Sequence, residues 1–104
     1  MVARDIQPHV NTLQTAMAPS QRALAVRALA GCRHGSTDAV KSIIFHSAQN
    51  DLSPMVRVVS IEELCKLGYY DSAFMAFLTK ACDDPSPEVK TAAKDAMMKM
   101  TPQK

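Results

Sequence analysis

Apolar side chains recur along this chain at intervals of three and four residues, the spacing that places them on one face of an α-helix. The clearest stretch is 54–67, which contains Val56, Val59, Leu64 and Leu67. A stripe of this width is typical of a helix that packs one side against a protein core. The pattern therefore predicts an amphipathic helix over 54–67.

The residues at the ends of this helix support the same prediction. Ser53 is a natural N-cap, because its hydroxyl can accept a hydrogen bond from a free backbone N–H group. Pro54 suits the first helical position, where its missing N–H is not needed, and Gly68 can end the helix by adopting a positive φ. The sequence Asp-Pro-Ser-Pro at 84–87 repeats this start and predicts a further helix from residue 87.

The same reasoning along the whole chain predicts six helices. They lie near 5–17, 20–34, 38–49, 54–67, 71–82 and 87–100. Short turns join them, so helices that are neighbours in sequence are expected to pack as antiparallel neighbours in space. No Gly- or Ser-rich linker divides the chain, and we expect residues 1–104 to form a single all-α domain.

Several residues also recur at an interval of 33. The matching sets are the acids Asp5, Asp38 and Asp71, the serines Ser20, Ser53 and Ser86, and the cysteines Cys32 and Cys65. Self-similarity at this period indicates a solenoid of stacked helix pairs, with repeat units of about 5–34, 38–67 and 71–100. In this register Ser20 caps the second helix, and Cys32 and Cys65 occupy equivalent buried positions on stacked helices.

Composition agrees with helices and argues against a β-sandwich. Aromatic residues make up only 5% of the chain and Trp is absent, whereas Met and Ala are abundant. Small and flexible side chains suit closely packed helices, while strands favour β-branched and aromatic residues.

The sequence gives no sign of a membrane or an export route. No apolar run approaches the roughly 20 residues that span a bilayer, and the N-terminus lacks the apolar stretch of a secretory signal. Three cysteines are an odd number, which favours free thiols in a reducing compartment. We therefore expect a cytoplasmic protein that does not bind membranes.

No motif predicts catalysis, a metal site or a cofactor. The candidate metal ligands are Cys32, Cys65, Cys82, His9, His34 and His46. They lack the C-x-x-C spacing of zinc sites, and no His is followed by Glu, a pair that can hold two iron ions in some helical enzymes. No nucleophile motif or Gly-rich phosphate loop is present either. We expect structural cysteines and a protein that is not an enzyme.

One run of residues combines an acidic loop, a proline, a Val-Arg pair and a later Leu-Gly. It consists of Asp51, Pro54, Val56, Arg57, Ser60, Leu64, Leu67 and Gly68, and it returns as Asp84, Pro87, Val89, Lys90, Ala93, Met97 and Met100. Over about residues 18–100 this pattern resembles the HEAT repeat, particularly the short bacterial type related to phycobilisome-lyase repeats. The resemblance implies a right-handed α-α superhelix, a solenoid of about three HEAT-like helix pairs.

In HEAT repeats, loop acids and helix arginines of neighbouring repeats form a ladder along the stack. The resemblance implies that Asp51 with Arg57, and Asp84 with Lys90, are members of such a ladder. An acid before a helix start and a partly buried guanidinium do attract one another. Lys90 departs from the family's arginine and lacks its two-pronged geometry.

Binding to nucleic acid would depend on the mildly basic first half of the chain. Its candidate side chains are Arg22, Arg27, Arg33 and Lys41. Phosphate contacts supply most of non-specific affinity, so this few bases would bind weakly and in a salt-sensitive way. We rank nucleic acid third among the possible partners.

The function that fits a short solenoid is the binding of another protein. The resemblance places the helices at 5–17, 38–49 and 71–82 on the concave face. Candidate contact residues there are Gln7, Asn11, Gln14, Lys41, Phe45, Met75 and Thr79, with Tyr69 and Tyr70 in a nearby turn. The alternative for Phe45 and Met75 is packing into the next helix pair, and for the tyrosines it is packing within the loop.

We therefore predict a non-catalytic adaptor or scaffold whose partner is a protein of unknown identity. An accessory subunit or chaperone-like lyase partner in pigment or cofactor attachment is the second hypothesis, and the phycobilisome-lyase resemblance alone suggests it. The last helix carries Met97, Met98 and Met100, and self-association through this helix is also an open alternative.

Overall fold

Helices account for the regular structure of the residues that the structure describes. The computed structural model describes residues 6–32, 37–69 and 71–100. Within them lie six helices and no strand: α1 (Gln7–Thr15), α2 (Pro19–Gly31), α3 (Asp38–Asn50), α4 (Pro54–Lys66), α5 (Ser72–Ala81) and α6 (Pro87–Met100). The predicted all-α class is confirmed. None of the described helices is long and apolar enough to cross a membrane.

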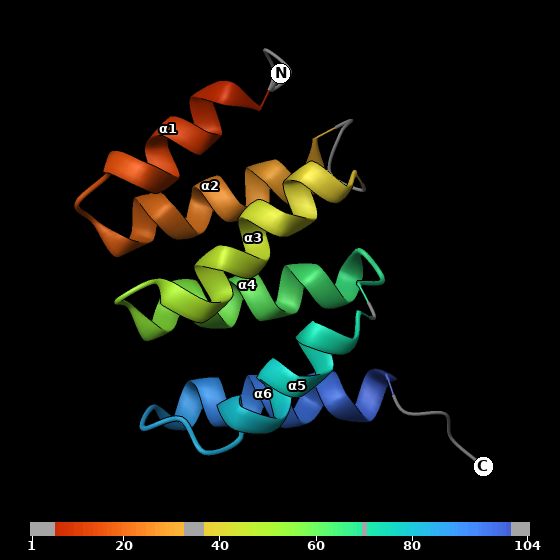
Figure 1. Ribbon diagram of the computed structural model, residues 1–104. Coiled ribbons are helices and arrows are strands. Elements are labelled where there is room, and N and C mark those ends of the chain that lie inside the picture. The colour runs from red at the N-terminus through yellow and green to blue at the C-terminus, as the bar shows by residue number, and fades with distance from the viewer. Residues whose placement is uncertain (1–5, 33–36, 70, 101–104) are drawn as a thin grey trace.

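The helices form two layers (Figure 1). The even-numbered helices pack side by side, with α4 between α2 and α6, and each odd-numbered helix lies against the even-numbered helix that follows it. Among the described residues, no comparably close packing joins α1 to α3 or α3 to α5. The radius of gyration is 13.1 Å, close to the roughly 13 Å of a compact domain of this length. The odd-numbered helices thus pack less closely with one another than the even-numbered helices do.

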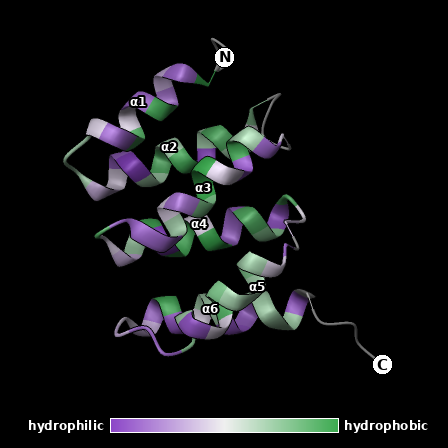
Figure 2. Cartoon of the chain, viewed as in Figure 1, coloured by the Kyte–Doolittle hydropathy of each residue, from purple (hydrophilic) through white to green (hydrophobic). Residues whose placement is uncertain are grey.

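The core lies between the two layers and is centred on α4. Its largest fully buried side chains are Leu29, Ile44, Ile61, Leu64, Phe74 and Leu78. Because α4 contacts α2, α3 and α6, it buries residues around much of its circumference and is less one-sided than the predicted amphipathic helix. By contrast, α5 is hydrophobic or neutral along most of its length (Figure 2).

The first helix pair does not follow the 33-residue spacing. Helix α2 begins at Pro19 with Ala18 as its N-cap, so Ser20 lies inside the helix and does not cap it. Pro19 corresponds to Pro54 and Pro87, the first residues of α4 and α6, which makes the intervals 35 and then 33 residues. The prediction for Ser20 was wrong because proline marks a helix start more firmly than serine, which is also tolerated in a first turn.

The corrected register changes which residues are equivalent. Cys32 is the C-cap of α2, whereas Cys65 lies inside α4, so the two cysteines are not counterparts. The counterparts on the three even-numbered helices include Ala25, Ser60 and Ala93, all of which are buried. Small side chains at one height let these helices approach closely.

Helices α3 and α5 are capped by side chains, whereas α1 is not. Ser53 is the N-cap of α4 as predicted, but its hydroxyl accepts no capping hydrogen bond. Thr37 accepts a hydrogen bond from the backbone N–H of Val40 at 3.4 Å, and Asp71 accepts one from that of Ala73 at 2.7 Å. Asp38 therefore lies in the first turn of α3 rather than at its cap. Gly68, with a φ of 72°, follows the end of α4 as predicted. Asp5 lies outside the described residues.

Candidate protein-binding face

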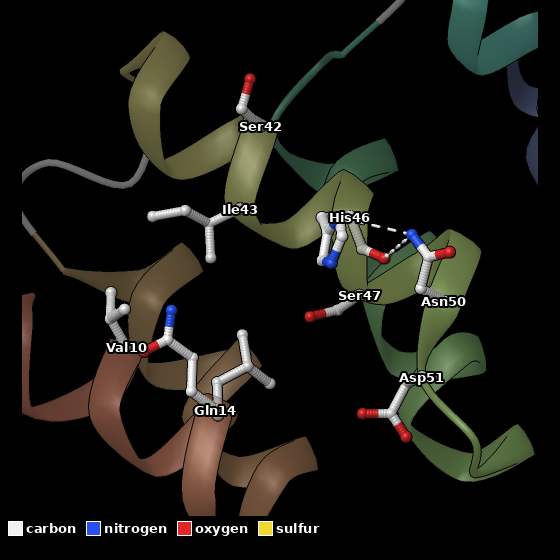
Figure 3. Close-up of a pocket in the computed structure, with 9 residues that line it drawn as sticks. Val10, Gln14, Ser42, Ile43, His46, Ser47, Asn50 and Asp51 are labelled. Atoms are coloured by element: carbon white, nitrogen blue, oxygen red, sulfur yellow. Dashed lines mark hydrogen bonds between the residues drawn. The ribbon is translucent and has the colours of Figure 1, made fainter.

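A groove separates α1 from α3 on the open side of the odd-numbered layer. Its volume is about 570 Å³. It is lined by Val10, Leu13 and Gln14 from α1, by Ser42, Ile43, His46, Ser47 and Asn50 from α3, and by Asp51 (Figure 3). An apolar lining with a few converging polar groups is the usual make-up of a binding site.

The groove combines an apolar floor with hydrogen-bonding groups along α3. Val10 is buried and Ile43 is half-buried, so these two aliphatic side chains belong both to the core and to the groove. The amide Nδ2 of Asn50 donates to the backbone oxygen of His46 at 3.1 Å and lies 3.3 Å from its Nδ1. Both of these α3 side chains are exposed and can contact a ligand in the groove.

Comparison with the next pair of odd-numbered helices explains why the groove is open. Between α3 and α5, the ring centroid of Phe45 lies 5.7 Å from the ring centroids of Phe74 and Phe77, and both contacts are edge-to-face. At a spacing of 34 residues, which superposes the buried side chains of these helices, Asn11 stands in place of Phe45 and Ile43 in place of Phe77. The gap between α1 and α3 therefore lacks these aromatic rings, while a second space of about 740 Å³, lined in part by Ala48, Ala76 and Phe77, also remains between α3 and α5.

Two predicted contact residues belong to this aromatic cluster. Phe45 lies against Tyr69, Phe74 and Phe77, so the alternative in which it packs into the next helix pair is the one that the structure shows. Tyr69 also contacts Phe74 at 5.4 Å. Burial raises the pKa of the Tyr69 hydroxyl, and the charges of Asp71 and Asp38 raise it further. These aromatic side chains hold α3 and α5 together.

The other predicted contact residues lie in different settings. Met75 is half-buried against the core, and Lys41 is also half-buried. The exposed ones are Gln7, Asn11, Gln14 and Thr79. Gln7 donates to Asn11 at 2.9 Å, Thr79 donates to the backbone oxygen of Met75, and Gln14 lines the groove. Tyr70 lies outside the described residues. The structure thus brings Gln14, and not Phe45, to the groove.

A two-pronged ion pair joins the first helix pair to the second. Nε and Nη2 of Arg22 donate to the two carboxylate oxygens of Asp51 at 2.9 and 3.0 Å. The Nη1 group of Arg22 donates to the backbone oxygens of Ala16 and Met17. Asp51 also accepts from the backbone N–H of Ser53, which fixes the loop that leads into α4. Asp51 therefore bonds through its side chain to Arg22, rather than to Arg57 as the resemblance implies.

A similar but weaker contact joins the second pair to the third. Nη2 of Arg57 lies 3.3 Å from the Oδ1 of Asp84, and its Nη1 donates to the backbone oxygen of Asp51 at 2.8 Å. The buried Nε of Arg57 has no hydrogen-bond partner among the described residues. Asp84 accepts from the backbone N–H of Ser86, as Asp51 does from that of Ser53.

Lys90 is the third member of this series by its place in α6. It is exposed, and it forms no ion pair with Asp84 or any other acid in the part of the chain that the structure describes. The pairing of Asp84 with Lys90 is therefore absent there, because the acid lies toward α4 and meets Arg57. Arg22, which sequence reasoning considered only for charge, would have been found by aligning Pro19 with Pro54.

The basic side chains of α2 are partly neutralised by acids. Arg22 pairs with Asp51, and Nη1 of Arg27 lies 3.6 Å from the carboxylate of Glu63. Glu63 is buried and also accepts from Lys66 at 3.3 Å. Arg33 lies outside the described residues. These contacts leave α2 with less free positive charge than its sequence suggests.

The cysteines are free thiols and lie half-buried. The Sγ of Cys82 is 3.6 Å from the Sδ of Met97, and burial raises the pKa of the Cys65 thiol. Over residues 6–32, 37–69 and 71–100, no cluster of three or more His, Cys, Asp or Glu side chains could hold a metal ion.

Comparison of the chain with known protein families, curated proteins and solved structures found no match. No protein-family model matches the chain, and no curated protein or solved structure matches it either. The resemblance to HEAT repeats therefore rests on the residues quoted above.

Proposed function

We propose that this chain is a non-catalytic, cytoplasmic adaptor that holds another protein on the open face formed by α1, α3 and α5. Its three helix pairs would form a short right-handed solenoid of the HEAT type. The observation that carries the proposal is the groove between α1 and α3, with its aliphatic floor and its polar α3 edge. Such a surface suits an apolar side chain flanked by hydrogen-bonding groups.

The ion pairs between helix pairs support this proposal because they make the face rigid before a partner binds. Arg22 fixes the loop at Asp51, and the groove extends to that residue. Arg57 ties the same loop to Asp84. A surface that is already ordered avoids much of the entropic cost of binding.

The proposal can be tested with a tagged chain expressed in the source organism. Proteins that copurify are identified by mass spectrometry, and the affinity of the purified candidate is then measured by calorimetry. Ser42→Tyr places a large ring at the groove, so we expect it to weaken binding at least about tenfold. Circular dichroism during heating checks that the variant still folds.

Glu62→Tyr is the matched control, since it adds the same ring to an exposed position of α4, in the other layer. We expect this variant to bind the partner like the parent chain. Equal losses in both variants, or full binding by Ser42→Tyr, would place the partner elsewhere and defeat the proposal.

A further inference from the structure

Within the described residues, the series of ion pairs between helix pairs does not continue beyond Asp84. Arg22 of α2 pairs with Asp51 in the next loop, and Arg57 of α4 pairs with Asp84 in the loop after that. Lys90 holds the corresponding position on α6, three residues after the first residue of the helix, as the two arginines do. The next acid in this series would have to come from outside the described chain.

The side of α6 that continues the series is also exposed. On α4, the residues Val58 and Ile61 border the small spaces shared with α6. The counterpart of Ile61, 33 residues later, is Lys94, which is exposed. The counterpart of Val58 is Thr91, which lines the same space as Val58. Ile61 is fully buried, so Lys94 puts a charge where the preceding pair has core. Met98, further along α6, is 65% exposed.

This end face carries unneutralised positive charge. Lys90 and Lys94 are one helical turn apart and therefore lie on the same side of α6. Neither forms an ion pair within the described ranges, and like charges at this spacing repel one another. A carboxylate placed between them would remove this repulsion.

We propose that the end face of α6 docks a different protein, one that presents an acidic loop residue directly before a helix with small apolar side chains. The acid would meet Lys90 as Asp84 meets Arg57. The small side chains would lie on α6 as Ala92 and Ala96 lie at the spaces beside α4. Charge complementarity selects this occupant, and the site does not depend on the groove between α1 and α3.

A second copy of this chain fits the end face poorly. Its N-terminal end would offer Ala16 at the place of Asp51, because the backbone oxygen of Ala16 accepts from Arg22 as that of Asp51 accepts from Arg57. Among the described residues, that end therefore offers no carboxylate at the place where Lys90 needs one. Two copies joined through α6 would bring their lysines together, which electrostatic repulsion disfavours.

A peptide provides the probe. It copies residues 83–99 with Lys90→Gln, Lys94→Gln and Lys99→Gln, and so presents Asp84 ahead of the apolar side of α6. Binding of the labelled peptide to the full chain is followed by fluorescence anisotropy at low salt. We expect saturable binding that weakens as salt is added and falls at least about fivefold in the Lys90→Glu chain.

Two further variants make the test specific. Lys80→Glu makes the same charge change at an exposed position of α5 and is expected to leave binding unchanged. A peptide with Asp84→Lys should bind the Lys90→Glu chain better than it binds the parent. Absence of saturable binding, or binding that ignores Lys90, would overturn the proposal. Sedimentation showing Lys90-dependent self-association would identify a second copy as the occupant and overturn it as well.

Discussion

Asp51 makes more structural contacts than any other acid described above. Its carboxylate receives both prongs of Arg22 and the backbone N–H of Ser53, and its backbone oxygen receives Arg57. The side chain of Asp51 is only 9% exposed, so these hydrogen bonds are protected from water. Asp84 accepts a single, longer contact from Arg57.

Replacing Asp51 should destabilise the protein more than replacing Asp84 does. We expect Asp51→Asn to lower the free energy of unfolding by about 1–3 kcal/mol, the usual effect of losing hydrogen bonds to a charged group. Asp84→Asn should cost clearly less, because Arg57 contacts it through one nitrogen only. Urea denaturation of both variants at neutral pH measures the two losses, and equal losses would contradict the argument.

Ser60 is a polar residue in an apolar place. Its side chain is fully buried, and its hydroxyl oxygen has no hydrogen-bond partner among the described residues. The counterparts Ala25 and Ala93 are buried too, so a methyl group fits at this height of the even-numbered layer. We expect Ser60→Ala to raise the free energy of unfolding by about 1 kcal/mol, since it removes an unsatisfied hydroxyl.

The reciprocal change at Ala93 is the control for Ser60. Ala93→Ser adds a hydroxyl to the matching buried position of α6 and should destabilise the protein by a similar amount. Chemical denaturation of both variants gives the comparison. A loss of stability in Ser60→Ala would mean that the hydroxyl has a favourable role that its surroundings do not show.

At the scale of the helices, Phe45, which the sequence suggested as a partner-contact residue, packs in the aromatic cluster between α3 and α5. Phe45 touches Tyr69, Phe74 and Phe77, which come from the turn after α4 and from α5. We expect Phe45→Ala to lower the free energy of unfolding by about 3 kcal/mol, the low end for phenylalanine because the ring is half-buried. His46→Ala, at the exposed neighbouring position, should change it by less than about 0.5 kcal/mol.

Thermal and urea unfolding of these two α3 variants measure the effect. The result also decides how a loss of partner binding by Phe45 variants is interpreted. If Phe45→Ala unfolds more easily, its binding defect reports on folding rather than on contact. Unchanged stability would return Phe45 to the list of candidate contact residues.

The helices could be predicted because their signals are local. Apolar spacing and helix-start residues are properties of a few neighbouring positions, so α4 and α6 begin at the prolines that the sequence indicates. The predicted start of α2 was wrong because Ser20 and Pro19 are adjacent, and either residue can stand in a first helical turn. The 35-residue interval appears only when Pro19 is aligned with Pro54.

The groove could not be predicted from the same signals. It lies between α1 and α3, where the aromatic rings that Phe45 and Phe77 bring to the next gap are missing. Which gap contains such rings depends on side chains from separate helices, and periodicity within one helix contains no such information. Gln14 was predicted as a contact residue from its polar position on α1, but its neighbours across the groove were not.

At the scale of the whole molecule, the even-numbered layer has an interior and two ends. Helix α4 lies between α2 and α6, so its residues are covered from both sides. Within the described residues, equivalent positions on α6 have an even-numbered neighbour, α4, on one side only. Ile61 of α4 is fully buried, whereas Lys94, at the equivalent position of α6, is exposed.

Exchanging the two residue types should therefore have opposite consequences. Ile61→Lys buries a charge without a partner and should lower the free energy of unfolding by about 3 kcal/mol or more. Lys94→Ile should leave folding intact, because its side chain lies on the surface, yet enlarge the apolar area around Met98 and promote self-association. Sedimentation velocity at several concentrations would detect the new oligomers, and denaturation would measure both stabilities. A monomeric Lys94→Ile chain would show that Lys94 is not needed to keep this end of the molecule from associating.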